Sequence, residues 1–161
     1  MNMVKRFMGL AIAFACSILV LSVGASLTDL GPWYQALKQP TWKPPDAAFG
    51  IIWSVIFTLC ALSGWGAWQL ANTYAQKMRI AFLFAMNGAL NILWSWLYFN
   101  QQRPDWAMTE LYFLWASIVL LMIGLWPLSK KSSVMLLPYL VWVTTAGFLN
   151  AATIELNGPF V

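Results

Sequence analysis

Residues 7–27 read FMGLAIAFACSILVLSVGASL and contain no charged side chain. About 20 apolar residues are needed for a helix to cross the roughly 30 Å hydrocarbon core of a bilayer, so this stretch predicts a membrane-spanning helix. Four more stretches are comparably long and apolar: residues 47–70, 80–100, 106–128 and 134–154. Backbone in lipid must satisfy its own hydrogen bonds, and the alternating segments of a transmembrane β-barrel are missing from the sequence. The sequence therefore predicts an all-α membrane protein, a single domain (1–161) of five transmembrane helices.

The composition agrees with a surface that faces lipid. Of the 161 residues, 61% are hydrophobic and 9% are charged, whereas soluble domains carry roughly 25% charged residues because their surface faces water. The chain has no histidine, which excludes His-ligated haem, His-based zinc sites and His-dependent nucleophilic triads. Cys16 and Cys60 lie inside apolar runs without metal-ligand spacing, so we interpret them as packing residues and expect no metal and no required cofactor. The basic residues are scattered, which argues against nucleic-acid binding.

The basic residues also predict the orientation in the membrane. Five crossings place the N-terminus and the connections 71–79 and 129–133 on one side, together with Lys5, Arg6, Lys77, Arg79, Lys130 and Lys131. The opposite side carries three basic residues and all five acids: Lys38, Lys43, Arg103, Asp29, Asp46, Asp105, Glu110 and Glu155. The excess of Lys and Arg on the first side predicts that the N-terminus is inside the cell.

The first stretch has an alternative interpretation as a cleavable secretory signal. Lys5 and Arg6 precede its apolar run, and Val23-Gly24-Ala25 resembles a cleavage site. The apolar run is longer than the roughly 7–15 residues usual in such signals, which favours a retained span.

Residues 28–46, TDLGPWYQALKQPTWKPPD, form the one long connection and hold four of the eight prolines. Pro44 and Pro45 suit the opening turn of the following helix. A long loop in so compact a protein is often functional. We expect residues 33–37 to form a short interfacial helix over the mouth of the bundle.

Tryptophan is unusually frequent, with 11 residues in the chain. An interfacial belt, in which indoles keep their N–H near water, accounts for those near span ends: Trp65, Trp68, Trp96 and Trp126. Trp142 lies near the middle of the fifth span, where lipid offers its N–H no partner. It therefore either faces a polar cavity or ligand, or serves plain helix packing.

The stretch 80–100 carries two contrasting faces at the helical period of 100° per residue. One face is a ridge of small residues, Ala81, Ala85 and Ala89, which lets two helices approach closely inside the bundle or across a homodimer. The other face carries Asn87, Asn91, Trp94 and Tyr98. Amides avoid lipid, so Asn87 and Asn91 either bond neighbouring helices or orient a bound molecule.

No conventional catalytic arrangement is visible in the sequence. The stretch 106–128 has Trp106, Glu110 and Phe113 on one stripe, and we interpret Glu110 as a solvated acid or a partner of Arg103. Paired carboxylates, a glycine-rich phosphate loop and HExxH are missing.

Three groups of residues resemble the motifs of one family. The first is WYQALKQPTWKPP at 33–45 followed by Trp53, the second is ALNILW at 89–94, and the third is PYLVW at 138–142 with Leu149-Asn150. Together they resemble the translocator protein, or tryptophan-rich sensory protein, family (the peripheral-type benzodiazepine receptors). The likeness covers essentially the whole chain, in order.

The resemblance implies a five-helix bundle that binds porphyrins or similar hydrophobic ligands in a pocket under the 28–46 loop. It assigns to the lid or the pocket Trp33, Tyr34, Phe49, Trp53, Asn91, Trp94, Trp106, Phe113, Trp142, Ala146 and Leu149. It also implies a homodimer through the ridge of Ala81, Ala85 and Ala89, in the lipid bilayer of a bacterial cell membrane. The sterol-recognition pattern of some members is lost, because Ala151 and Glu155 stand where it has Tyr and Arg.

Three functions remain open from the sequence. The leading hypothesis is a membrane receptor or carrier for a tetrapyrrole, whose flat ring would stack on indoles. A second is light-dependent porphyrin breakdown at Trp53 and Trp142, and a third is a regulator that signals ligand occupancy. The physiological ligand and downstream partners are not readable from the sequence.

Overall fold

The computed structural model describes residues 3–160, and their regular structure is helical throughout, which confirms the all-α class. In chain order the elements are α1 (Met3–Leu27), α2 (Pro32–Ala36), α3 (Asp46–Leu70), α4 (Tyr74–Ser95), a π-helical turn (Trp96–Asn100), α5 (Pro104–Leu125), α6 (Lys130–Val134) and α7 (Leu137–Asn157). Five helical segments in the described range are long and apolar enough to cross a membrane. The prediction of five transmembrane helices is confirmed.

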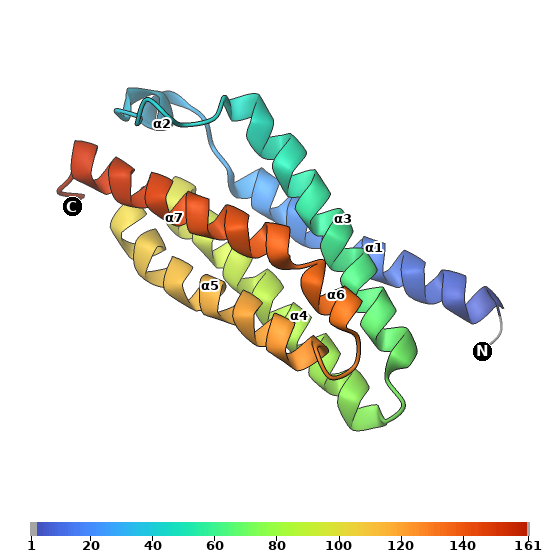
Figure 1. Cartoon of the computed structure of the whole chain (residues 1–161). Helices are drawn as coiled ribbons and strands as arrows, with labels where there is room; N and C mark the ends of the chain where they lie inside the picture. Colours follow the sequence, from blue (N-terminus) through green and yellow to red (C-terminus); the bar gives the residue numbers. More distant parts are fainter. Residues whose placement is uncertain (1–2, 161) are drawn as a thin grey trace.

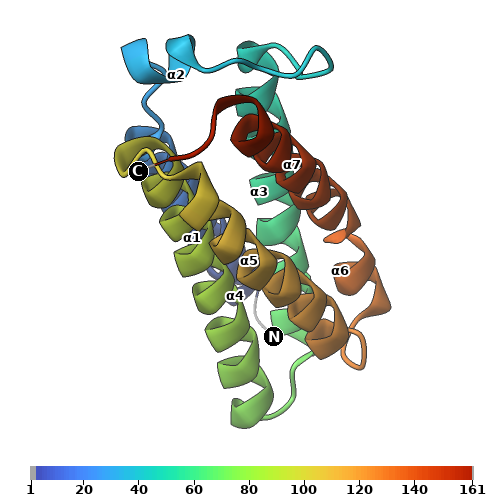
Figure 2. The same ribbon diagram turned by 90° about the vertical axis from the view of Figure 1, so that its left-hand side faces the viewer.

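The long helices pack as one bundle, and their connections are short apart from the one between α1 and α3, which contains α2 (Figures 1 and 2). The helix α2 and the C-terminal end of the chain lie at one end, and the N-terminal end lies at the other with the α3–α4 and α5–α6 connections. Packing is most extensive between α4 and α5, between α1 and α3, and between α5 and α7. The two groups of connections are therefore separated as the count of five crossings requires.

Several span boundaries differ from the predicted ones by a few residues, and two of the differences have identifiable causes. The third span begins at Tyr74 rather than 80, because Thr73 and Gln76 form a reciprocal capping box that starts the helix early. The fifth span is interrupted between α6 and α7, because Pro138 has no N–H to bond the carbonyl of Val134. Sequence hydropathy alone shows neither feature.

The densest part of the core lies between α3, α5 and α7. Its most enclosed side chains are Ile118, Leu121, Leu125, Leu136, Tyr139 and Val143, each at most 1% exposed. In contrast, Gly24 is the one buried residue of α1 in the described range. Most other described side chains of α1 are exposed or half-buried, and α1 lines both hollows of the bundle.

Candidate ligand pocket

A cavity of about 350 Å³ lies beneath the loop 28–46, at the end of the bundle that carries α2. Its walls come from α1, α2, α3, α4, α7 and the loop. The lining residues are Val20, Leu21, Gly24, Ala25, Thr28, Leu30, Tyr34, Asp46, Phe49, Gly50, Trp53, Phe57, Asn91, Trp94, Ser95, Phe99, Trp142 and Ala146. A volume of this size is within the range of small-molecule pockets, which are mostly apolar with a few placed polar groups.

Aromatic rings of two helices, α3 and α7, pair with one another at the walls of this pocket. Trp53 of α3 lies edge-on to Tyr139 of α7, with ring centroids 6.0 Å apart. Phe49 meets Trp142 edge-on at 5.4 Å. Such edge-to-face pairs hold the rings in fixed orientations, so the pocket is framed by rigid aromatic surfaces rather than by flexible side chains.

Two of the pocket indoles have unused hydrogen-bond donors. The Nε1 atoms of Trp94 and Trp142 are buried, and neither has a hydrogen-bond partner within residues 3–160. Both side chains line the cavity. An unpaired buried polar group costs free energy, roughly 1–3 kcal/mol in proteins. A ligand with acceptor atoms would relieve this cost by accepting hydrogen bonds from the two indole N–H groups. Plain helix packing offers these groups no acceptor.

The two asparagines of α4 both bond neighbouring helices. Asn87 donates to the Ser117 hydroxyl at 2.8 Å, and Asn91 donates to the Tyr139 hydroxyl at 3.2 Å. Asn91 in addition lines the candidate pocket. The interhelical alternative therefore holds for both amides, and Asn91 also presents its remaining surface to the cavity.

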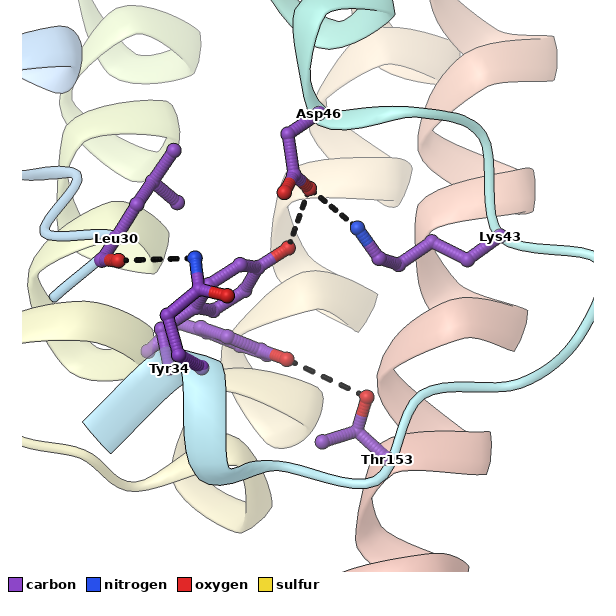
Figure 3. A network of polar contacts seen from close by, with 7 residues as sticks. Leu30, Tyr34, Lys43, Asp46 and Thr153 are labelled. Atoms are coloured by element: carbon purple, nitrogen blue, oxygen red, sulfur yellow. Dashed lines mark hydrogen bonds and ion pairs between the residues drawn. The ribbon is translucent and has the colours of Figure 1, made fainter. Parts of the chain in front are cut away.

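The lid of the pocket is held by a polar network (Figure 3). The Tyr34 hydroxyl of α2 donates to Asp46 Oδ1 at 3.0 Å, and the Lys43 ammonium pairs with the same carboxylate oxygen. A second anchor joins the loop to α7, where the Asn157 side chain bonds both the N–H and the carbonyl of Lys38 at 2.8 and 2.9 Å. The expected short interfacial helix is thus present as α2, and four side chains fasten its loop to the bundle.

As the pH rises from neutral, the lid network should persist until strongly alkaline conditions. Burial raises the pKa of Tyr34 above its ordinary 10.0. Burial lowers the pKa of Lys43, but its hydrogen bonds to Asp46 and Tyr34 outweigh that effect and raise it above 10.5. Both groups bind their proton more tightly in the folded than in the unfolded state. Their contribution to stability is therefore complete below the ordinary pKa values, and it is lost as the pH rises through the pKa values of the folded protein.

We therefore expect a spin label at exposed Gln35 (Gln35→Cys, with Cys16 and Cys60 replaced by Ala) to stay immobile up to about pH 10 and to become mobile above it. The Asp46→Asn variant, which weakens the network at every pH, should give a mobile label throughout. A mobility change near neutral pH would contradict this account of the lid.

Seven of the eleven predicted pocket and lid residues line the cavity: Tyr34, Phe49, Trp53, Asn91, Trp94, Trp142 and Ala146. The other four lie outside its walls. Trp33 packs edge-on against Tyr98, with centroids 6.1 Å apart, and supports the lid. Leu149 is buried away from the hollow, whereas Trp106 and Phe113 are 53% and 63% exposed on the outer face of α5.

The structure corrects the interpretation of Glu110. Its side chain is 6% exposed, and neither carboxylate oxygen has a partner within the described chain. Arg103 instead bonds Asp105 at 2.8 Å and stacks over the Trp106 ring. The reason is that α5 begins at Pro104, so Arg103 lies before the helix while Glu110 is carried onto its inward face. Glu110 is therefore neither solvated nor paired with Arg103.

Several pocket residues were missed by sequence reasoning. The α1 contribution, which includes Val20, Gly24 and Ala25, comes from a stretch that looks uniformly apolar in sequence. Gly50 and Ser95 were likewise missed. The recurrence of small residues at Gly24 and Gly50 was an available signal, because small side chains leave room for a ligand. No three His, Cys, Asp or Glu side chains within residues 3–160 are arranged to hold a metal ion.

The ridge of Ala81, Ala85 and Ala89 is exposed on the outer surface of α4. It faces away from Asn87 and Asn91, which are buried. The three alanines line a hollow of about 630 Å³ between α1, α3 and α4, so the ridge forms part of the α4 wall of that hollow.

The fold and the pocket together define an integral, multi-pass α-helical membrane protein with an aromatic cavity closed by a loop. Residues 10–156 match the TspO/MBR family. The chain is 32% identical over 158 residues to the tryptophan-rich protein TspO of Chlorobaculum tepidum, covering 95% of this chain and 98% of that one. It is 33% identical to protein CrtK of Rhodobacter capsulatus, covering 79% of each, and 24% identical to the human translocator protein, covering 73% and 70%. The chain belongs to the TspO/MBR family.

Proposed function

We propose that this member of the TspO/MBR family, whose relatives carry the names of sensory and translocator proteins, binds a porphyrin in the pocket beneath the lid. The observation that carries the proposal is the pair of buried, unpartnered indole donors of Trp94 and Trp142 in an aromatic cavity. A porphyrin combines a flat conjugated ring, which stacks on aromatic faces, with carboxylate acceptors for the indole N–H groups. The lid network supports a bound state that is sequestered from water.

The proposal is tested by titrating the protein with protoporphyrin in the dark and following the quenching of tryptophan fluorescence. Replacing Trp142 by Phe keeps an aromatic ring but removes the N–H donor. A hydrogen bond to a charged group contributes about 1.5–3 kcal/mol, so we expect Trp142→Phe to weaken binding by roughly 10- to 100-fold.

The matched control is Trp126→Phe, because Trp126 is exposed at the opposite end of α5 and lies outside the cavity. It should bind protoporphyrin as the native protein does. Equal affinities for the native protein and the Trp142→Phe and Trp53→Phe variants would overturn the proposal.

A transport measurement in sealed vesicles distinguishes a carrier from a receptor. If the native protein moves porphyrin across the vesicle membrane it acts as a carrier, and if it only binds porphyrin it acts as a receptor.

We further propose that the chain forms a homodimer through α4. The support is the exposed ridge of Ala81, Ala85 and Ala89, since small residues allow close helix approach in membranes. Replacing Ala85 by Phe should block that approach and shift the detergent-solubilised protein from dimer to monomer in light-scattering measurements. The control is Ala116→Phe, at an exposed alanine of α5. A dimer that persists in Ala85→Phe would place the interface elsewhere.

We also propose that the protein lies in a bacterial cell membrane with its N-terminus inside. The support is the excess of basic residues at the end of the bundle that holds the N-terminal part of the chain. Labelling of single cysteines at Lys38 and at Lys131 with a membrane-impermeant reagent in whole cells tests it, and only the first position should react.

A further inference from the structure

The wall of the ligand pocket carries a negative charge at its mouth. Asp46 is the one charged side chain among the residues of the described chain that line the cavity, and it stands where the loop 28–46 joins α3. The other residues of the wall are uncharged. Surroundings of low polarity screen charge less than water does. An unbalanced carboxylate at Asp46 would therefore repel an anionic ligand in the cavity.

The ammonium of Lys43 balances this charge. It pairs with Asp46 Oδ1, the oxygen that also accepts the hydrogen bond of the Tyr34 hydroxyl at 3.0 Å (Figure 3). It lies over the Tyr34 and Phe49 rings as well, 5.5 Å from each centroid, which is within the range of cation–π contacts. Tyr34, Asp46 and Phe49 line the cavity, whereas Lys43 does not. The ammonium is therefore held directly behind the wall by three residues of the wall.

The two other basic residues at this end of the bundle have different surroundings. Arg103 bonds Asp105, with 2.8 Å between its Nε and Oδ1 of the carboxylate, and its guanidinium stacks over the Trp106 ring. Lys38 is exposed on the loop, and neither of the two ion pairs within residues 3–160 includes it. The charge of Asp46 is thus paired with Lys43 alone in the described chain.

The ion pair lies close to the donors proposed for the ligand carboxylates. Phe49 contacts the Lys43 ammonium on one side and meets the Trp142 ring on the other, with ring centroids 5.4 Å apart. A single aromatic ring therefore links the ion pair to an indole whose N–H has no partner in the described chain. A ligand carboxylate bound to that indole would lie within the electrostatic reach of Asp46.

We propose that the Lys43–Asp46 pair sets the charge selectivity of the pocket, an inference that rests on the porphyrin binding proposed above. With the pair intact the wall is electrically balanced, and a porphyrin with free carboxylates is accepted. Without the ammonium, Asp46 repels such a ligand but leaves an uncharged porphyrin ester unaffected. Like charges brought together in a binding site are a common means of rejecting a ligand. Lys43 acts through Asp46, and Asp46 is the group that discriminates.

The experiment compares protoporphyrin with its dimethyl ester, which has the same ring without the charges. Both affinities are measured by tryptophan-fluorescence quenching in the dark. A looser lid affects the two porphyrins alike, so the ratio of their affinities isolates the effect of charge. We expect Lys43→Gln to lower the affinity for the free acid relative to the ester by at least about tenfold. Asp46→Asn should shift the ratio the opposite way, and the double variant should return it to the native value.

The matched control is Lys38→Gln, which removes the same charge from the same loop at an exposed residue that does not line the cavity. Its ratio should equal the native one. An equal ratio in Lys43→Gln would overturn the proposal. A double variant that keeps the low ratio of Lys43→Gln would overturn it too, because Lys43 would then bind the ligand directly. Either result leaves the proposed function standing, whereas a native protein that binds neither porphyrin refutes the proposed function and this inference together.

Discussion

Replacing Ala146 by Phe should abolish high-affinity porphyrin binding while leaving the bundle folded. Ala146 lines the pocket one helical turn after Trp142 on α7. A phenyl ring at this position would occupy space inside the 350 Å³ cavity. Because the ligand would have to displace it, we expect affinity to fall by at least about 100-fold, or about 3 kcal/mol. Protoporphyrin titration by fluorescence quenching measures the effect.

The control for this prediction is Ala151→Phe on the same helix. Ala151 is exposed and does not line the cavity, so the added ring would lie in lipid. Its affinity for protoporphyrin should equal that of the native protein. If Ala146→Phe bound as tightly as Ala151→Phe, the ligand would have to occupy another part of the molecule, and the pocket assignment would fail. Thermal unfolding of both variants checks that the comparison is made on folded protein.

A large loss of stability is expected for Gly147→Leu. Gly147 is buried on the face of α7 that meets α5, and a Cβ atom there would lie 3.2 Å from a methyl carbon of Leu111. A leucine cannot fit without separating the two helices, whose contact is among the most extensive in the bundle. Overpacking of this kind costs about 1–3 kcal/mol, which lowers the melting temperature by several degrees.

Phe148→Leu is the matched control, because residue 148 is the next position along α7 and is 66% exposed to the surroundings of the bundle. It should melt at nearly the native temperature. A melting temperature of Gly147→Leu close to native would show that α5 and α7 can separate without cost. The close contact of α5 with α7 would then have no role in fixing the wall that carries Trp142.

The two hollows of the bundle differ in the polar groups that line them. The pocket near the lid has two indole N–H donors without partners in the described chain, and the lid network lies over it. The unused donors suit a ligand with acceptor atoms. The other hollow has mostly apolar walls from α1, α3 and α4. Val20 and Phe57 line both hollows, so the two meet at these side chains.

The helices and their number were predictable because hydropathy depends only on local composition. Each predicted span has its counterpart, and α3 differs from its predicted bounds by one residue at one end. The boundaries that differed depend on single side chains, such as the Thr73 cap and the proline at 138. The inward orientation of Trp94 and Asn91 followed from helical periodicity together with the cost of polar groups in lipid.

The sequence by itself determined the class of protein and the five spans, since a chain this apolar needs lipid around it, and the resemblance of its motifs to one family identified seven of the residues that line the pocket. It did not determine which face of α1 meets the cavity, because α1 is apolar on every side and carries no periodic signal. It also did not show that Glu110 is buried while Trp106 and Phe113 face outward. Those outcomes depend on how the neighbouring helices pack around α1 and α5, and only the tertiary structure decides that.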